Sequence, residues 1–425
     1  MQQVELKLTA LLVVAMTTNA VADECAKLEV PATLDLRSSH DAKLPDIVDY
    51  GETQLDGFYT KLAQVARTKK GTLRVGIYGD SNWTNDRTAG EIRRRLQLAY
   101  GDAGHGFVAF GIPWGWYHHQ HLQHGTTGKW DVWNIATMEV RDKLYGFAGI
   151  TAESSQAGAT AWVETAKAGE PVGTRVSMIE VWYLARPKGG TFEVVIDTDS
   201  KAKVDTEAAV AELKVLTYRV PDGAHRLTLK VTKGRVRLFG AVFERDQPGV
   251  IVDGIGINAL SAATMTRMDP ANQSAGLTRR NYDLLIDATG TNMVSPREPW
   301  AAQAHAKLIV KHVEQWRVAL PKASILLWSA PDFISRGTTR STPRMKQNSR
   351  ERIQGAKDVK VAFWDQYEML GGYGSMPKWH KDRWDTPDGV HMGPMLSAYI
   401  GERFVYTVLS DLAKRVDKAP KLGCR

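Results

Sequence analysis

The chain has 425 residues, enough for two or three domains with several hydrophobic cores. Hydrophobic residues make up 43% of it and charged residues 24%, which excludes a disordered or fibrous protein. The 55 Lys and Arg residues exceed the 47 Asp and Glu residues by eight, an excess that fits attraction to an anionic surface and does not indicate a nucleic-acid partner.

Residues 1–22 have the pattern of an export signal. Lys7 precedes an apolar run over 8–16, and Ala20-Val21-Ala22 forms a small-x-small cleavage pattern. The alternative is a buried first helix. Because no later run of about 18 apolar residues follows, we expect no transmembrane segment. The sequence therefore predicts an exported protein, periplasmic or secreted.

The only two cysteines, Cys25 and Cys424, lie near the two ends of the expected mature chain. Export would place them in an oxidising compartment, where paired thiols tend to form disulfides. We therefore predict a Cys25–Cys424 disulfide, and the alternative is two free thiols.

The first part of the expected mature chain, 23–112, has an α/β pattern. Residues 72–79 (TLRVGIYG) predict a buried strand that ends in a turn. Residues 88–100 follow with apolar side chains at helical spacing, and glycines over 101–106 break this helix. A strand followed by a turn and a helix is typical of the start of an α/β fold.

Residues 113–248 have a different pattern, with short β-branched and aromatic runs separated by Gly, Pro and Asp turns. Strands are expected at 161–165, 177–184, 191–196, 212–219, 225–231 and 236–243. Short strands at this spacing predict a β-sandwich, inserted after the first strand and helix.

The α/β pattern returns over 249–425. Strands are expected at 250–257, 282–288, 324–328 and 359–364, and helices at 301–318 and 394–416. Together with the strand at 72–79, they predict a three-layer, doubly wound parallel sheet that the β-rich segment interrupts.

Two distant motifs contain the residues of a nucleophilic site. Gly79-Asp80-Ser81 ends the first parallel strand, and sites in such sheets form beyond the carboxyl ends of strands. Asp388-Gly389-Val390-His391 precedes the last helix and could supply a base and the carboxylate that orients it. Taken alone, Ser81 could be a helix cap and the second motif a surface loop.

A third motif, Gly290-Thr291-Asn292, follows the strand expected at 282–288. The side chain of Asn292 could donate a hydrogen bond to an oxyanion. Its alternative is an Asn in an ordinary turn.

These three motifs, in this order, resemble those of the SGNH (GDSL-like) hydrolase superfamily over about 71–112 and 248–416. The resemblance implies Ser81 as nucleophile, His391 as general base and Asp388 as the residue that orients it. It also implies an oxyanion hole formed by the Ser81 N–H, the Asn292 side chain and a backbone N–H at Ala259. The stretch Gly256-Ile257-Asn258-Ala259 departs from the family, which has Gly at the last position, and Ala tolerates a positive φ poorly.

Further motifs are similar to those of the peptidoglycan O-acetylesterase branch: residues 100–107 (YGDAGHGF), 371–376 (GGYGSM) and Trp379. Members of this branch can have a carbohydrate-module-like β-sandwich inserted after the first block. Together with the export signal, this resemblance implies an exported esterase that removes O-acetyl groups from cell-wall glycan. The serine mechanism requires no metal or organic cofactor, and we expect a monomer. The alternatives are a general SGNH carboxylesterase or lipase, or an inactive glycan-binding protein.

Aromatic and His residues are concentrated near the start of the β-rich segment: Trp114, Trp116, Tyr117, His118, His119, His121, His124, Trp130 and Trp133. Aromatic faces can stack on sugar rings, so this cluster could form a glycan platform; the alternative is core packing. Because no paired Cys or acidic residue completes a ligand set in this stretch, we expect no metal site there.

Overall fold

The computed structural model describes residues 27–294 and 301–424. The predicted export signal and Cys25 lie outside the described residues. Cys424 is disulfide-bonded. Its pairing with Cys25 stays a prediction.

A six-stranded sheet lies at the centre of one part of the molecule, with strand order β1-β17-β16-β15-β2-β14. The strands are β1 (Val48–Asp49), β2 (Thr72–Gly79), β14 (Gly249–Gly256), β15 (Leu284–Ala288), β16 (Ser324–Trp328) and β17 (Ala362–Trp364). All neighbouring pairs are parallel except β1 with β17. β2 is the first strand of the parallel part along the chain. β14 pairs with it on one side, and β15 pairs with it on the other side, followed by β16 and β17. A crevice forms beyond the strand ends at such a reversal.

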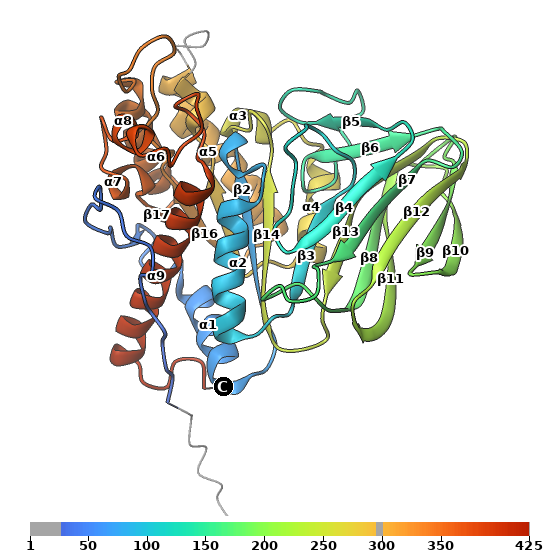
Figure 1. Cartoon of the computed structure of the whole chain (residues 1–425), viewed down its shortest axis with the longest axis horizontal. Coiled ribbons are helices and arrows are strands. Elements are labelled where there is room, and N and C mark those ends of the chain that lie inside the picture. Colours follow the sequence, from blue (N-terminus) through green and yellow to red (C-terminus); the bar gives the residue numbers. More distant parts are fainter. Residues whose placement is uncertain (1–26, 295–300, 425) are drawn as a thin grey trace, which may run out of the picture.

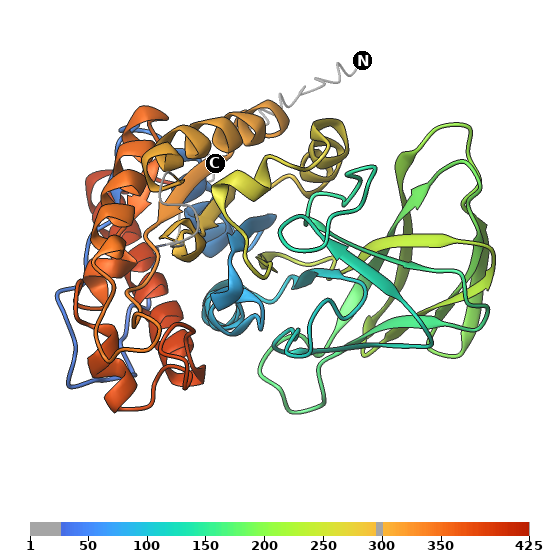
Figure 2. The same ribbon diagram turned by 90° about the horizontal axis from the view of Figure 1, so that it is seen from above.

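Helices cover both faces of this sheet (Figures 1 and 2). Successive strand residues point to opposite faces, so Ile77 packs with one core and Tyr78 with the other. The first core includes α1 (Asp56–Thr68), α2 (Arg87–Tyr100) and α9 (Pro394–Lys418). The second includes α3 (Ala262–Met265), α4 (Pro270–Arg280), α5 (Ala301–Ala319) and α6 (Arg344–Asp358). Two short helices, α7 (Gln366–Met369) and α8 (Met376–Lys381), precede α9.

Two antiparallel sheets form the other part of the molecule (Figure 2). One has the order β11-β8-β13-β6-β5, with β3 also paired to β13, and the other has the order β10-β9-β12-β7-β4. Apolar residues from both, such as Val181 of β8 and Leu229 of β12, share one core. The strands are β3 (Gly104–Ala109), β4 (Leu122–Thr127), β5 (Asp131–Asn134), β6 (Ile150–Ser154), β7 (Thr160–Thr165), β8 (Val176–Ala185), β9 (Thr191–Ile196), β10 (Asp199–Asp205), β11 (Glu212–Gly223), β12 (Arg226–Lys233) and β13 (Val236–Glu244).

Strand β3 begins within the glycine-rich stretch that was expected only to end a helix. Gly104 and Gly106 have φ values of 109° and 94°, in the region that favours glycine. A Cβ at Gly104 would lie 2.4 Å from Cα of Glu244, and one at Gly106 would lie 2.0 Å from Oδ1 of Asp253. The glycines therefore allow β3 to lie close to its neighbours rather than only breaking the helix.

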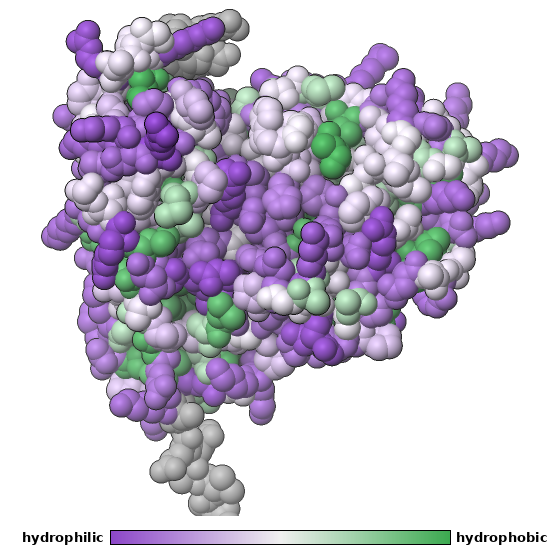
Figure 3. All heavy atoms as spheres, viewed as in Figure 1, coloured by the Kyte–Doolittle hydropathy of each residue, from purple (hydrophilic) through white to green (hydrophobic). Residues whose placement is uncertain are grey.

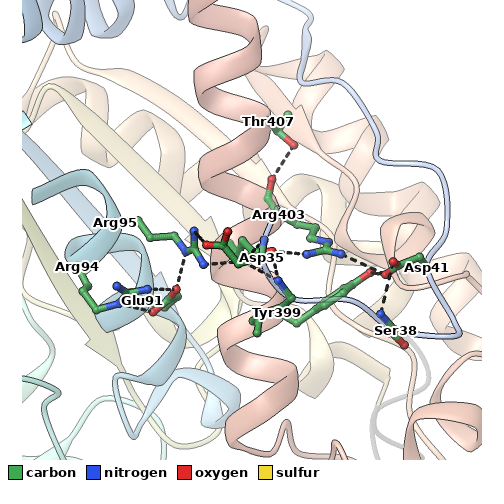
Figure 4. A network of polar contacts seen from close by, with 11 residues as sticks. Asp35, Ser38, Asp41, Glu91, Arg94, Arg95, Tyr399, Arg403 and Thr407 are labelled. Carbon is green, nitrogen blue, oxygen red and sulfur yellow. Dashed lines mark hydrogen bonds and ion pairs between the residues drawn. The ribbon is translucent and has the colours of Figure 1, made fainter. Parts of the chain in front are cut away.

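The N-terminal segment lies along α9 and is held there by polar contacts (Figure 4). The N–H groups of Asp35 and Leu36 donate to the buried carboxylate of Glu402 at 3.1 Å. Arg95 of α2 also donates to Glu402, at 2.5 Å, and Arg403 donates to Asp41 at 3.2 Å. One buried acid thus joins the first described segment, the helix after β2 and the last helix.

The face of the molecule in Figure 3 is mainly hydrophilic, with hydrophobic residues in small separate groups. Over the described ranges, no helix combines the length and the apolar character needed to cross a bilayer.

A buried ionic network joins the parallel sheet to the antiparallel part. Arg280 of α4 donates to both carboxylate oxygens of Asp253 on β14, at 2.8 and 3.0 Å, and to Glu244 on β13 at 2.6 Å. Arg74 of β2 donates to the other oxygen of Glu244 at 2.7 Å. Burial raises the pKa of Glu244, but the two arginines lower it more, to about 2. Each charged group in the network is therefore stabilised by the opposite charges that contact it.

Replacing Arg280 with Met should lower the free energy of unfolding by about 3–5 kcal/mol, because two buried carboxylates lose their main partner. Arg279→Met on the same helix is the matched control. Arg279 is half-exposed where it pairs with Glu180, so its loss should cost about 1 kcal/mol or less. Denaturant unfolding of both variants measures the difference, and equal losses would contradict the role given to the network.

Candidate active site

The turn after β2 is tightly packed. A Cβ on Gly79 would lie 2.0 Å from the Trp83 ring, so only glycine fits there. Asp80 follows and is buried; its oxygens accept hydrogen bonds from the N–H of Asn82 at 3.1 Å and of Thr291 at 3.2 Å. Burial raises the pKa of Asp80 more than these hydrogen bonds lower it. Asp80 thus ties the loop after β2 to the loop after β15.

Asn82, the residue after Ser81, connects a third loop. Its side-chain oxygen accepts a hydrogen bond from the N–H of Met392 at 2.8 Å, and its amide nitrogen lies 3.5 Å from the Thr291 hydroxyl. Met392 directly follows His391 in the chain. The residues flanking Ser81 therefore position the other two predicted motifs around it.

A line of hydrogen bonds runs from Ser81 through His391 to Asp388. Oγ of Ser81 lies 2.8 Å from Nε2 of His391, although 310 residues separate them in the chain. Nδ1 of His391 lies 2.6 Å from Oδ2 of Asp388. With Nδ1–H donating to the carboxylate, Nε2 is left to accept the proton of the serine hydroxyl. This is the arrangement that activates a serine as a nucleophile.

The second oxygen of Asp388 accepts three more hydrogen bonds. The donors are the Thr386 hydroxyl at 2.6 Å and the N–H groups of Val390 at 2.9 Å and His391 at 3.0 Å. Burial raises the pKa of Asp388, but hydrogen bonds, first that from Thr386, hold it well below its usual range. Asp388 is therefore ionised at neutral pH and fixed in orientation.

Three predicted oxyanion donors come from the loops after β2, β14 and β15. Among the described residues, the N–H groups of Ser81 and Ala259 have no hydrogen-bond acceptor. Ala259 adopts a φ of 62°, the left-handed conformation that disfavours alanine. The Asn292 amide donates to the carbonyl of Leu260 at 3.1 Å, which uses one of its two hydrogens. The other hydrogen has no acceptor among the described residues.

Ser81 and His391 line a cavity of about 790 Å³, within the usual size range of ligand pockets. The lining residues are Ser81, Asn85, Arg87, Trp116, His118, Gln120, Thr386, Asp388, His391, Met392 and Pro394. Both parts of the molecule contribute, because Trp116, His118 and Gln120 belong to the segment between β3 and β4. Of the predicted aromatic cluster, Trp114 and Tyr117 are buried, whereas Trp116 is exposed at the cavity.

This segment is anchored to the loop that contains the serine. The indole N–H of Trp116 donates to the Thr84 hydroxyl at 3.0 Å, and the N–H of Gln120 donates to Asp86 at 2.9 Å. Arg93 of α2 holds Asp86 with two hydrogen bonds, at 2.9 and 3.0 Å. The cavity wall is therefore attached to the residues that follow Ser81.

Behind this wall, Asp86, His105 and His119 are buried with ligand atoms within 4.8 Å of one another, a spacing that could suit a metal ion. Arg93 occupies both oxygens of Asp86, so a positive charge already lies where a cation would bind. Nδ1 of His119 lies 3.2 Å from Nε2 of His105, and Nε2 of His119 lies 3.0 Å from the Tyr117 hydroxyl. These contacts account for the cluster as an Arg93–Asp86 ion pair beside hydrogen-bonded His105, His119 and Tyr117.

Sequence comparisons found no matching family model and no matching curated protein. The structure is similar to that of a peptidoglycan O-acetylesterase, with a TM-score of 0.70, 22% identity, and coverage of 88% of this chain and 99% of that one. It also matches a family two carbohydrate esterase from Cellvibrio japonicus, with 12% identity, coverage of 69% of this chain and 99% of that one, and a TM-score of 0.28. That second score is too low to carry an argument. The match to the peptidoglycan O-acetylesterase confirms, at the level of the fold, the resemblance predicted from the sequence.

The buried histidines behind the cavity wall should make the stability depend on pH. Burial lowers the pKa of His119 to about 4, despite the nearby Asp86. An unfolded His has a pKa of about 6.5, so the stability is complete above that pH and is lost as the pH falls toward 4. The melting temperature should therefore fall between about pH 6.5 and 5, before most carboxylates titrate.

His119→Gln should make this dependence shallower, because the substituted residue takes up no proton on unfolding. Thermal unfolding followed by circular dichroism at several pH values tests the expectation. The same slope in both proteins would contradict it.

Proposed function

We propose that the chain is an exported serine esterase that removes O-acetyl groups from cell-wall peptidoglycan. The observation that carries the proposal is the hydrogen-bonded line of Ser81, His391 and Asp388, at 2.8 and 2.6 Å, at the edge of a cavity. The fold likeness to a peptidoglycan O-acetylesterase supports the choice of substrate. We also propose that the fold is a three-layer, doubly wound SGNH-type domain, with 113–248 as an inserted, carbohydrate-module-like β-sandwich.

In the first step, Oγ of Ser81 attacks the carbonyl carbon of the acetyl ester while Nε2 of His391 takes the hydroxyl proton. Asp388 stays ionised and stabilises the imidazolium that forms. The negative charge on the former carbonyl oxygen is stabilised by hydrogen bonds from the Ser81 and Ala259 N–H groups and the Asn292 amide. One such donor is typically worth about 3 kcal/mol in the transition state.

In the second step, the tetrahedral intermediate collapses and the C–O bond to the sugar breaks. His391 gives its proton to the sugar oxygen, which leaves as a hydroxyl, and the acetyl group remains on Ser81. Water then attacks the acetyl-serine, with His391 again taking a proton. Collapse of the second intermediate releases acetate and restores the Ser81 hydroxyl. Every bond change uses groups of this chain, the ester and water.

The chemistry of the cavity also fits a glycan ester. Trp116 lines it with an exposed ring face, which can stack on a sugar ring. The eight excess positive charges of the chain suit peptidoglycan, which carries carboxylates. The disulfide bond of Cys424 fits an oxidising compartment, and hence export to the periplasm or beyond. We propose Cys25 as its partner and a monomer as the active form.

Ser81→Ala should lower kcat on an acetyl ester by a factor on the order of 10⁴ to 10⁶, because the nucleophile is lost. The rate of acetate release from O-acetylated peptidoglycan measures this decrease in kcat, with de-acetylated peptidoglycan as the blank. An unchanged melting temperature would establish that the variant is folded.

A fluorophosphonate probe separates an esterase from an inactive glycan-binding protein. The wild-type chain should be labelled and Ser81→Ala should not be. Turnover by Ser81→Ala close to that of the wild type would refute the mechanism. Hydrolysis of simple or long-chain esters without release of acetate from peptidoglycan would instead indicate a general carboxylesterase or lipase.

Two variants test the oxyanion donors separately. Asn292→Ala should lower kcat about 10² to 10³-fold with little change in KM, because its amide acts mainly in the transition state. Ala259→Gly keeps the backbone N–H and removes the strain of a left-handed alanine, so kcat should be preserved and stability raised by about 1 kcal/mol. Full activity in Asn292→Ala would remove that side chain from the mechanism.

A further inference from the structure

Arg87, at the start of α2, lines the same cavity as Ser81 and is half-buried there. Among the residues that the structure describes, none forms a hydrogen bond or ion pair with its guanidinium. The other arginines of this helix are all engaged: Arg93 pairs with Asp86, and Arg94 and Arg95 both pair with Glu91. Arg87 is thus exceptional within its own helix.

The charge of Arg87 is also uncompensated within the cavity. Asp388 is the only carboxylate among the described lining residues, and its oxygens are taken up by His391 and Thr386. An arginine that is half removed from water and is not paired with a carboxylate favours an anionic ligand, because its planar group can donate two parallel hydrogen bonds to a carboxylate.

A second feature of the cavity indicates which kind of ligand carries the anionic group. Trp116 is 56% exposed, yet its one polar atom is satisfied by Thr84, whose hydroxyl donates in turn to the Ser81 carbonyl at 2.8 Å. The ring is therefore held in place beside the serine with a face available for stacking. Rigid indole faces of this kind suit the apolar face of a sugar ring.

We propose that Arg87 is a specificity-determining residue that binds a carboxylate on the acetylated sugar whose ester Ser81 cleaves. The inference rests on the proposed esterase function and narrows its substrate to an anionic sugar ester. The cavity, at about 790 Å³, has room for such a sugar as well as for the acetyl group. Arg87 takes no part in bond making or breaking, so its contribution is to kcat/KM on anionic substrates alone.

A matched pair of esters tests this. The first is 6-O-acetyl-N-acetylglucosamine; the second is 6-O-acetyl-N-acetylmuramic acid, the same acetylated sugar with a lactyl ether that carries a carboxylate. The wild-type chain should have a kcat/KM about ten-fold or more higher on the anionic ester, as expected for a charge-assisted hydrogen bond. Added salt should reduce this preference.

Arg87→Gln should abolish the preference by lowering kcat/KM on the anionic ester only, and its kinetics should lose their salt dependence. Arg87→Lys should keep part of the preference, because the charge remains without the paired donors. The control is Arg219→Gln, which removes the same charge from an exposed position on β11, away from the cavity. It should keep the preference in full.

Three results would overturn the inference: no preference in the wild type, a preference that survives in Arg87→Gln, or an equal loss by Arg87→Gln on both esters. Each of them leaves the esterase proposal standing, because the neutral ester is still cleaved by the wild-type chain. Failure of the wild type to cleave either ester would refute the proposed function itself, and the inference with it.

Discussion

Three buried hydrogen bonds around Ser81 bring the site together. Two end on Asp80, from Asn82 and Thr291, and the third runs from Met392 to Asn82. They join the loop after β2 to the loop after β15 and to the loop before α9. Leaving a buried polar group without its partner costs about 1–3 kcal/mol, so these contacts favour a single arrangement of the three loops. The 2.8 Å contact of Ser81 with His391 depends on that arrangement.

The strand order explains why such distant residues meet. β2 is hydrogen-bonded to both β14 and β15, so the loops that follow these three strands emerge side by side. Ala259 and Asn292 follow the outer two strands, on either side of Ser81. The cavity lies where the sheet order reverses, which is where open α/β sheets bind ligands. The buried network of Arg280, Asp253 and Glu244 then holds the antiparallel part against this sheet, on the side of β14.

Many strands and helices of the fold could be predicted from the sequence, because their local residue pattern agrees with the final structure. β2 and β16 are short, mostly apolar strands and lie at their predicted bounds. α6 was missed because most of its residues are polar or charged, and its buried face includes Asn348 and Arg352, which no hydrophobic period reveals. α1 and α4 were also not anticipated. β3 was missed because its glycines also match a helix end.

The residues of the candidate site were likewise predictable only in part. The sequence predicts Ser81, Asp388 and His391, because they belong to motifs that occur in a recognisable order. Thr386 has no such signal beyond being a hydroxyl residue two positions before an aspartate. Nothing local distinguishes Arg87 from the three other arginines of its helix either. What singles it out is the absence of a partner among the described residues, and that depends on the folded structure.

The antiparallel part leaves the α/β part through β3 and returns through β13, and these two strands are hydrogen-bonded neighbours. Its entry and exit are thus adjacent, so the segment between them can lengthen, shorten or be exchanged without changing the strand order of the parallel sheet. The proposed reacting groups all lie outside this segment, whereas Trp116, His118 and Gln120 of the cavity wall lie inside it. Changes within this segment would therefore alter the wall of the cavity while the proposed reacting groups stay in place.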